Sequence, residues 1–74
     1  MDVRRRVSLN MQALRREKGW SQEELAHRAG MHRTYVSGVE RGVRNPTLTV
    51  LDKIAQALEV GIGALTDADP TPQA

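Results

Sequence analysis

The feature that most constrains this 74-residue chain is a short helix with clear signals at both ends. Ser21 and Glu24 fit the S-x-x-E capping box, which satisfies the free amide hydrogens of a helix N-terminus. Trp20 and Leu25 stand at the two positions of a hydrophobic staple around that cap. Gly30 follows after only two turns and suits the left-handed residue that ends many helices. The pattern predicts a helix of about eight residues.

A second short helix is predicted after a three-residue connection, residues 30–32. The interval from Arg33 to Arg41 carries Val36 and Val39 at helical spacing, and Gly42 marks its end. Two short helices joined by a tight turn with a glycine are typical of a helix-turn-helix. Both are short because the second must enter a DNA major groove about 12 Å wide while the first braces across the backbone.

The rest of the ordered sequence also has helical periodicity, so the predicted fold is all-α. A first helix over residues 3–18 places Val7, Met11 and Leu14 on one face. Thr47 is predicted to cap a fourth helix that runs through Leu58, and Gly61 is predicted to break it. Its apolar stripe comprises Leu48, Leu51, Ile54, Ala55 and Leu58.

The C-terminal part is predicted to add little ordered structure. Residues 62–65 can form one last helical turn. Residues 67–74 contain two prolines and almost no bulky side chain, which indicates a disordered tail. The sequence therefore predicts one ordered domain, over residues 1–66. We expect this domain to carry both DNA binding and dimerisation.

Composition excludes several classes of protein. The chain has no cysteine, two histidines and no apolar run near the ~20 residues of a membrane span. We therefore expect no disulfide, no metal site, no cofactor and a cytoplasmic location. No Ser/His/Asp set, glycine-rich phosphate loop or paired-carboxylate signature is present, so the sequence predicts a protein that is not an enzyme.

Positive charge is concentrated in the first part of the sequence. Residues 1–45 contain nine arginines and one lysine against five acidic residues, whereas residues 46–74 contain one lysine and four acidic residues. Arginine forms bidentate contacts with phosphate and guanine. This asymmetry indicates a polyanionic partner on one face of the molecule.

Three consecutive arginines, Arg4, Arg5 and Arg6, stand at the start of the first helix. The helix dipole disfavours cations there, and Asp2 offsets this only in part. The turn is expected either to fray or to be held by an anionic ligand. A minor-groove arm is one interpretation. We favour a solvated helix end that attracts DNA diffusely.

The run WSQEELAHRAGMHRTYVSGVERGVRNPTLTVLDKIAQALEV resembles the helix-turn-helix of the Cro/C1 (Xre-type) regulators, with coverage from Ala13 to Leu65. Within that family, R-T-Y-V-S-G-V-E-R-G in a short chain is most similar to controller proteins of restriction–modification systems. The resemblance implies a compact five-helix, lambda-repressor-like domain. It also implies a homodimeric transcriptional regulator that binds a double-stranded operator upstream of its own gene and an endonuclease gene.

The same resemblance implies further partners and one alternative. RNA polymerase is a candidate partner, because such regulators act beside it. The alternative is an antitoxin-type or phage-type regulator that also binds a partner protein. The genomic neighbour, an endonuclease or methyltransferase gene against a small toxin gene, discriminates the two.

The resemblance also assigns roles to individual residues. Base reading is expected from Arg33, Thr34 and Ser37, although the Ser37 hydroxyl can equally bond its own helix. Phosphate contacts are expected from Gln22, Tyr35, Arg41, Arg44 and Asn45, and Tyr35 can equally pack under the loop. Arg15 and Glu40 match a structural ion pair. The dimer interface is expected at Leu48, Leu51, Ile62 and Leu65.

Two positions depart from the family pattern. His32 stands where a better capping residue is common before the recognition helix. Gly38 occupies a place where some members of the family carry a base-contacting side chain, so Arg33 is expected to carry more of the readout.

Overall fold

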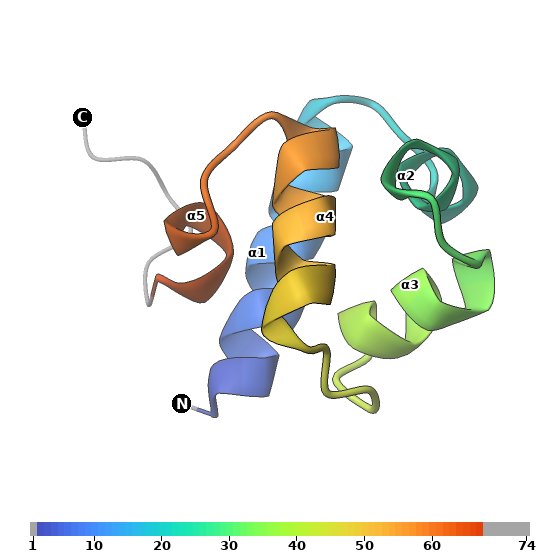
Figure 1. Ribbon diagram of the computed structural model, residues 1–74. Coiled ribbons are helices and arrows are strands. Elements are labelled where there is room, and N and C mark those ends of the chain that lie inside the picture. The colour runs from blue at the N-terminus through green and yellow to red at the C-terminus, as the bar shows by residue number, and fades with distance from the viewer. Residues whose placement is uncertain (1, 68–74) are drawn as a thin grey trace.

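The computed structural model describes residues 2–67, and every regular element in that range is a helix (Figure 1). The predicted all-α fold is confirmed. The tail predicted for residues 67–74 lies outside the described residues from residue 68 onward. The helices are α1 (Val3–Glu17), α2 (Gln22–Ala29), α3 (Arg33–Glu40), α4 (Leu48–Leu58) and α5 (Gly63–Thr66).

Side-chain caps fix where two of the predicted helices begin. The hydroxyl of Ser21 accepts a hydrogen bond from the Glu24 amide at 3.0 Å, and that of Thr47 accepts from the Val50 amide at 3.2 Å. The second half of the predicted capping box is replaced, because the Glu24 carboxylate accepts from Nε of Arg28 at 2.7 Å. The first helix has its own cap, Asp2, which accepts from the Arg4 amide at 2.8 Å.

The connection between α2 and α3 has the predicted tight geometry. Gly30 ends α2 at φ +72°, and its neighbour Met31 donates its amide to the Ala26 carbonyl at 2.9 Å. A positive φ is cheap only for glycine, which explains why the turn needs that residue here. His32 makes no side-chain cap, in keeping with its weak capping preference.

Helix α4 stops at Leu58, as predicted, but the residue that ends it differs from the prediction. Glu59 rather than Gly61 takes the left-handed conformation, at φ +62°. The amide of Val60 donates to the Ala55 carbonyl at 2.9 Å and completes the turn. The sequence did not indicate Glu59 for this role, because a glutamate normally avoids the left-handed conformation.

One apolar core joins the helices. Met11, Leu25, Val36, Ile54 and Leu65 are fully buried in it, so each of the five helices contributes at least one side chain. Leu48, although part of the predicted stripe on α4, is 71% exposed. The core therefore uses the stripe from Leu51 onward.

The arrangement of the helices leaves one face of α3 open. Helix α3 packs against α1 and α2, and α2 also packs against α4. Figure 1 shows α2 and α3 on one side of the molecule and α5 on the opposite side. Helix α5 is held to α1 by Asn10, whose amide donates to the Leu65 carbonyl at 2.7 Å. Among the described helices, none has the length and apolar character to cross a membrane.

Candidate nucleic-acid interface

The exposed face of α3 begins with the predicted base-reading residues. Arg33 and Thr34 are exposed in the first turn, Ser37 is half-buried one turn later, and Val36 and Val39 on the other face are buried. Eight residues make a helix about 12 Å long, close to the width of the major groove. The helix thus presents short or flexible polar groups to solvent while its opposite face is anchored in the core.

The N-termini of α2 and α3 line one hollow, and Arg33 is the first residue of α3. Gln22 of α2 and Arg33 of α3 line the same open hollow of about 360 Å³, together with Ser21 and Glu23. Such a hollow has room for a phosphate group, and a guanidinium and an amide are both suitable donors to phosphate oxygens. The structure therefore brings a predicted phosphate contact and a predicted base reader to one place.

A network around Glu40 ties three helices together. Arg15 donates from Nε and from a terminal nitrogen to the two carboxylate oxygens of Glu40, at 2.7 and 3.0 Å. The side chains are 11% and 3% exposed, so this ion pair is largely removed from solvent. Gln22 donates its side-chain amide to Glu40 at 3.0 Å. One amide hydrogen of Gln22 is thereby used, and the second is oriented by the same bond.

The backbone at the end of α3 is fixed by residues that sequence reasoning missed. The hydroxyl of Ser8 and the amide of Gln12 both donate to the carbonyl oxygen of Glu40, the latter at 2.8 Å. Ser8, Gln12 and Arg15 follow one another at four and three residues, which places them on one face of α1. That spacing was a usable signal, but polar residues at helical spacing usually indicate a solvated face rather than a contact.

Arg44 reaches back over α3. Its amide donates to the Gly38 carbonyl at 3.1 Å, and its guanidinium carbon lies 5.6 Å from the centre of the Tyr35 ring. A Cβ atom at Gly38 would collide with the side chain of Arg44. Gly38 is therefore a covered position and not a missing base contact. Tyr35 packs against the core edge under Arg44.

The remaining predicted phosphate contacts are exposed at the end of α3 and in the following loop. Arg41 and Asn45 both lie on the surface. Within residues 2–67, neither side chain has a hydrogen bond or an ion pair. Their polar groups are available to a ligand without breaking a contact.

Two of the four residues expected at a dimer interface cannot serve there. Leu65 is fully buried and Leu51 is only 8% exposed, because both side chains pack into the core of the single chain. Leu48 is exposed and Ile62 is half-buried. The surface that a second copy can contact therefore contains Leu48 and Ile62.

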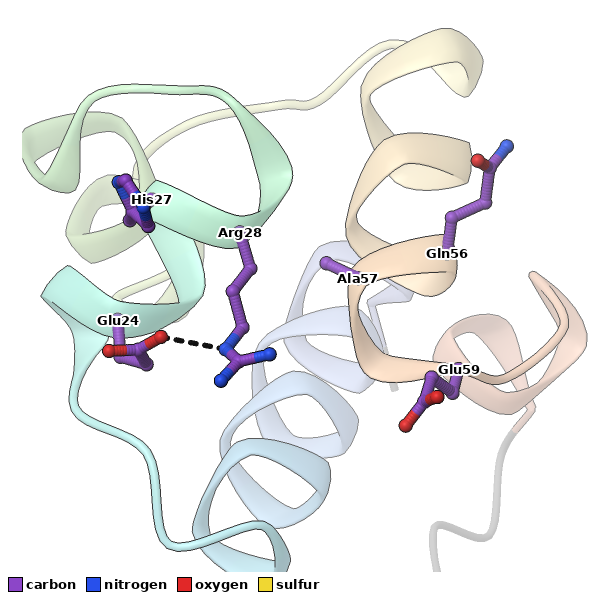
Figure 2. Close-up of a pocket in the computed structure, with 6 residues that line it drawn as sticks. All are labelled: Glu24, His27, Arg28, Gln56, Ala57 and Glu59. Carbon is purple, nitrogen blue, oxygen red and sulfur yellow. Dashed lines mark hydrogen bonds and ion pairs between the residues drawn. The ribbon is translucent and has the colours of Figure 1, made fainter.

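A second hollow lies between α2 and α4, on a different part of the surface (Figure 2). Figure 2 shows Arg28 turned toward Glu24, to which it donates at 2.7 Å. The guanidinium carbon of Arg28 also lies 4.3 Å from the ring centre of Trp20. Lys18 is paired with Glu59 at 3.0 Å nearby. Both cations here are paired with carboxylates, whereas Arg33 and Arg41 have no carboxylate partner within residues 2–67.

The described residues hold no cluster of three or more side chains suited to a metal ion. Three exposed carboxylates in this part of the chain are paired with Arg4, Arg28 and Lys18. Hydrogen bonds from Arg4 lower the pKa of Asp2, and one from Lys18 lowers that of Glu59. Both carboxylates lie outside the exposed face of α3.

Comparison with known proteins shows the family to which this chain belongs. The family model described as Helix-turn-helix matches residues 11–65. The chain is 48% identical over 73 residues to the uncharacterized HTH-type transcriptional regulator y4dJ of Sinorhizobium fredii, covering 97% of this chain and 95% of that protein. It is 40% identical over 65 residues to control protein C.SmaI of Serratia marcescens, covering 88% of this chain and 77% of the relative.

A solved structure of a controller protein has the same fold. The restriction–modification controller protein C.Esp1396I, crystallised as a tetramer with its natural 35-base-pair operator, matches with a TM-score of 0.78 and 41% identity. The match covers 82% of this chain and 80% of that one.

Proposed function

Since the chain belongs to the helix-turn-helix family of transcriptional regulators, we propose that it is a controller-type regulator that binds operator DNA through α3. The observation that carries the proposal is the placement of Arg33 and Thr34. Both are exposed at the start of a helix whose other face is buried and whose end is fixed by Glu40. Arg33 can contact guanine bidentately, and Thr34 can approach a base edge or methyl group.

Backbone contacts would set the position of α3 in the groove. Gln22 lies at the N-terminus of α2, where amide groups and the helix dipole favour a phosphate. Arg41, Arg44 and Asn45 would contact the strand at the other end of α3, and Tyr35 supports Arg44 from below. Ser37, half-buried in the second turn of α3, would be the third base-reading residue.

We propose that the active form is a symmetric homodimer on a pseudo-palindromic operator. One recognition helix discriminates only a few base pairs, and each wrong pair costs about 1–3 kcal/mol. A genome offers on the order of 10⁶ or more competing sites, so one module discriminates too weakly. Two modules on a two-fold axis add their discrimination and require half-sites roughly 34–36 Å apart. The similarity to C.SmaI and C.Esp1396I supports an operator upstream of the regulator's own gene and a restriction endonuclease gene.

The proposal is tested by fluorescence anisotropy with the duplex from upstream of the gene and a scrambled duplex at about 150 mM salt. We expect a preference of roughly 10³ or more for the upstream duplex, saturating at two protomers or a multiple of two. Equal, weak binding to both duplexes would contradict a sequence-specific regulator.

Two variants separate base reading from backbone contact. Arg33→Ala should cost about 1–3 kcal/mol on the upstream duplex and little on the scrambled one, because the lost contact is to a base. Arg44→Ala should weaken binding to both duplexes alike. It should also reduce the slope of log affinity against log salt by the value of about one phosphate contact per protomer. Equal weakening of both duplexes by Arg33→Ala would refute its base-reading role.

A further inference from the structure

The arginines of the first turn of α1 lie beside the end of the recognition helix. Arg4 and Arg5 line a hollow of about 220 Å³ together with Arg41 and Gly42, which follow α3. The buried Ser8 and the exposed Asp2 complete the lining. Three arginines from two segments far apart in the sequence thus line one small space.

The charge of this hollow is only partly compensated. Asp2 is bonded to Arg4 at 3.1 Å, so one carboxylate neutralises one guanidinium. In the part of the chain that the structure describes, Arg5 and Arg41 have neither an ion pair nor a hydrogen bond to their side chains. The Ser8 hydroxyl is directed at the Glu40 carbonyl, and among residues 2–67 Asp2 is the one carboxylate that lines the space. Arg5 therefore carries an unpaired positive charge at the positive end of α1, where a cation is unfavourable unless an anion is present. Arg41 adds a second unpaired charge to the same hollow from the end of α3.

We propose that this hollow binds a phosphate of the DNA backbone, held jointly by Arg5 of α1 and Arg41, with Arg4 at its edge. The inference rests on the proposed binding of α3 in the major groove. An eight-residue helix spans about 12 Å, so its two ends lie near the two strands that flank the groove. Gln22 and Arg33 lie at one end, and the hollow with Arg41 lies at the other. The first turn of α1 thereby becomes part of the DNA interface rather than a source of diffuse attraction.

The test measures how the dissociation constant depends on salt for wild type, Arg5→Gln, Arg41→Gln and the double variant, on the upstream and scrambled duplexes. Arg28→Gln is the matched control, because it removes the same charge from the α2–α4 hollow. We expect Arg5→Gln to weaken both duplexes several-fold and to reduce the slope of log affinity against log salt by about 0.9 per protomer. The double variant should weaken binding by less than the product of the single effects, because both side chains hold one phosphate.

An Arg5→Gln effect no larger than that of Arg28→Gln would overturn the proposal. Strictly multiplicative single effects would overturn the shared phosphate. The proposal that the chain is a sequence-specific regulator is tested separately. It fails if the wild type does not prefer the upstream duplex. The source of the anion is tested without DNA, by melting temperatures in inorganic phosphate and in chloride at equal ionic strength. Stabilisation by phosphate that Arg5→Gln abolishes, with unchanged DNA binding, would assign the hollow to a free anion and overturn the DNA assignment.

Discussion

The aliphatic part of the Arg44 side chain occupies the space that a Cβ atom at Gly38 would need. Arg44 is thereby laid across α3 with its guanidinium over the ring of Tyr35. A glycine in α3 thus leaves the space in which a cation of the next loop lies.

Gly38→Ala should separate stability from DNA affinity. The new methyl group must displace Arg44, and the affinity for any duplex should fall as far as it does in Arg44→Ala. The free energy of unfolding should change by less than about 1 kcal/mol, because the better helix propensity of alanine offsets the displacement. Anisotropy and urea unfolding measure the two quantities.

Gly63→Ala is the control for that experiment. Gly63 also lies in a helix, but the nearest atom to an added Cβ is a carboxylate oxygen of Asp67 at 3.9 Å. This variant should keep its DNA affinity. Wild-type affinity in Gly38→Ala would show that Arg44 binds DNA equally well from another position, or does not bind it.

The buried ion pair should matter far more than an exposed one. Glu40→Ala leaves Arg15 at 11% exposure without its carboxylate and also releases Gln22, so we expect a loss of about 3 kcal/mol or more in unfolding free energy. Glu24→Ala breaks the exposed pair with Arg28 and should cost under about 1 kcal/mol. Chemical denaturation of both variants provides the comparison. Similar losses would mean that the Glu40 network contributes no more than a surface contact.

The helices and their caps could be predicted from the sequence, because capping residues and glycines act within a few residues of the boundary they set. Ser21, Gly30 and Thr47 each fix a boundary through a hydrogen bond or a backbone conformation within a few residues. The end of α4 at Leu58 was predicted, but the role of Glu59 in ending it was missed, because Glu59 adopts a conformation that its residue type disfavours. Its side chain is held by Lys18, 41 residues away, which no local pattern reveals.

The candidate interface was readable only in part. The family resemblance pointed to Arg33, Gln22 and the pairing of Arg15 with Glu40. The contacts of Ser8 and Gln12 with the Glu40 carbonyl depend on how α1 packs against α3, and periodicity does not specify that packing. For the apolar residues of α4 and α5, the sequence indicated burial but not which surface buries them. A sequence shows that Leu51 and Leu65 are apolar, but only the fold shows that the core already covers them.

The pair between Lys18 and Glu59 should make a pH-dependent contribution to stability. The hydrogen bond from Lys18 lowers the pKa of Glu59 below its ordinary value of 4.5. A carboxyl group with a lowered pKa in the folded state stabilises the fold above its unfolded pKa and loses that effect as the pH falls through the folded value. The melting temperature of wild type should therefore exceed that of Glu59→Gln by a small, constant margin at pH 6–7. The margin should shrink as the pH falls below about 4.5. A margin that grows on acidification would contradict the assigned direction.

Self-association should depend on the exposed apolar side chain at the start of α4. Leu48 is 71% exposed and contributes little to the core of a single chain, so Leu48→Asp should leave monomer stability within about 0.5 kcal/mol of wild type. Burying a carboxylate at an interface is costly, so the same change should shift a dimer to monomers in sedimentation velocity. Val43→Asp is the matched control, because Val43 is 65% exposed in the loop before α4 and lies outside the predicted interface. Equal effects of the two variants on the sedimentation coefficient would place the interface elsewhere. A wild-type chain that sediments as a monomer at micromolar concentration would confine dimerisation to the DNA-bound state.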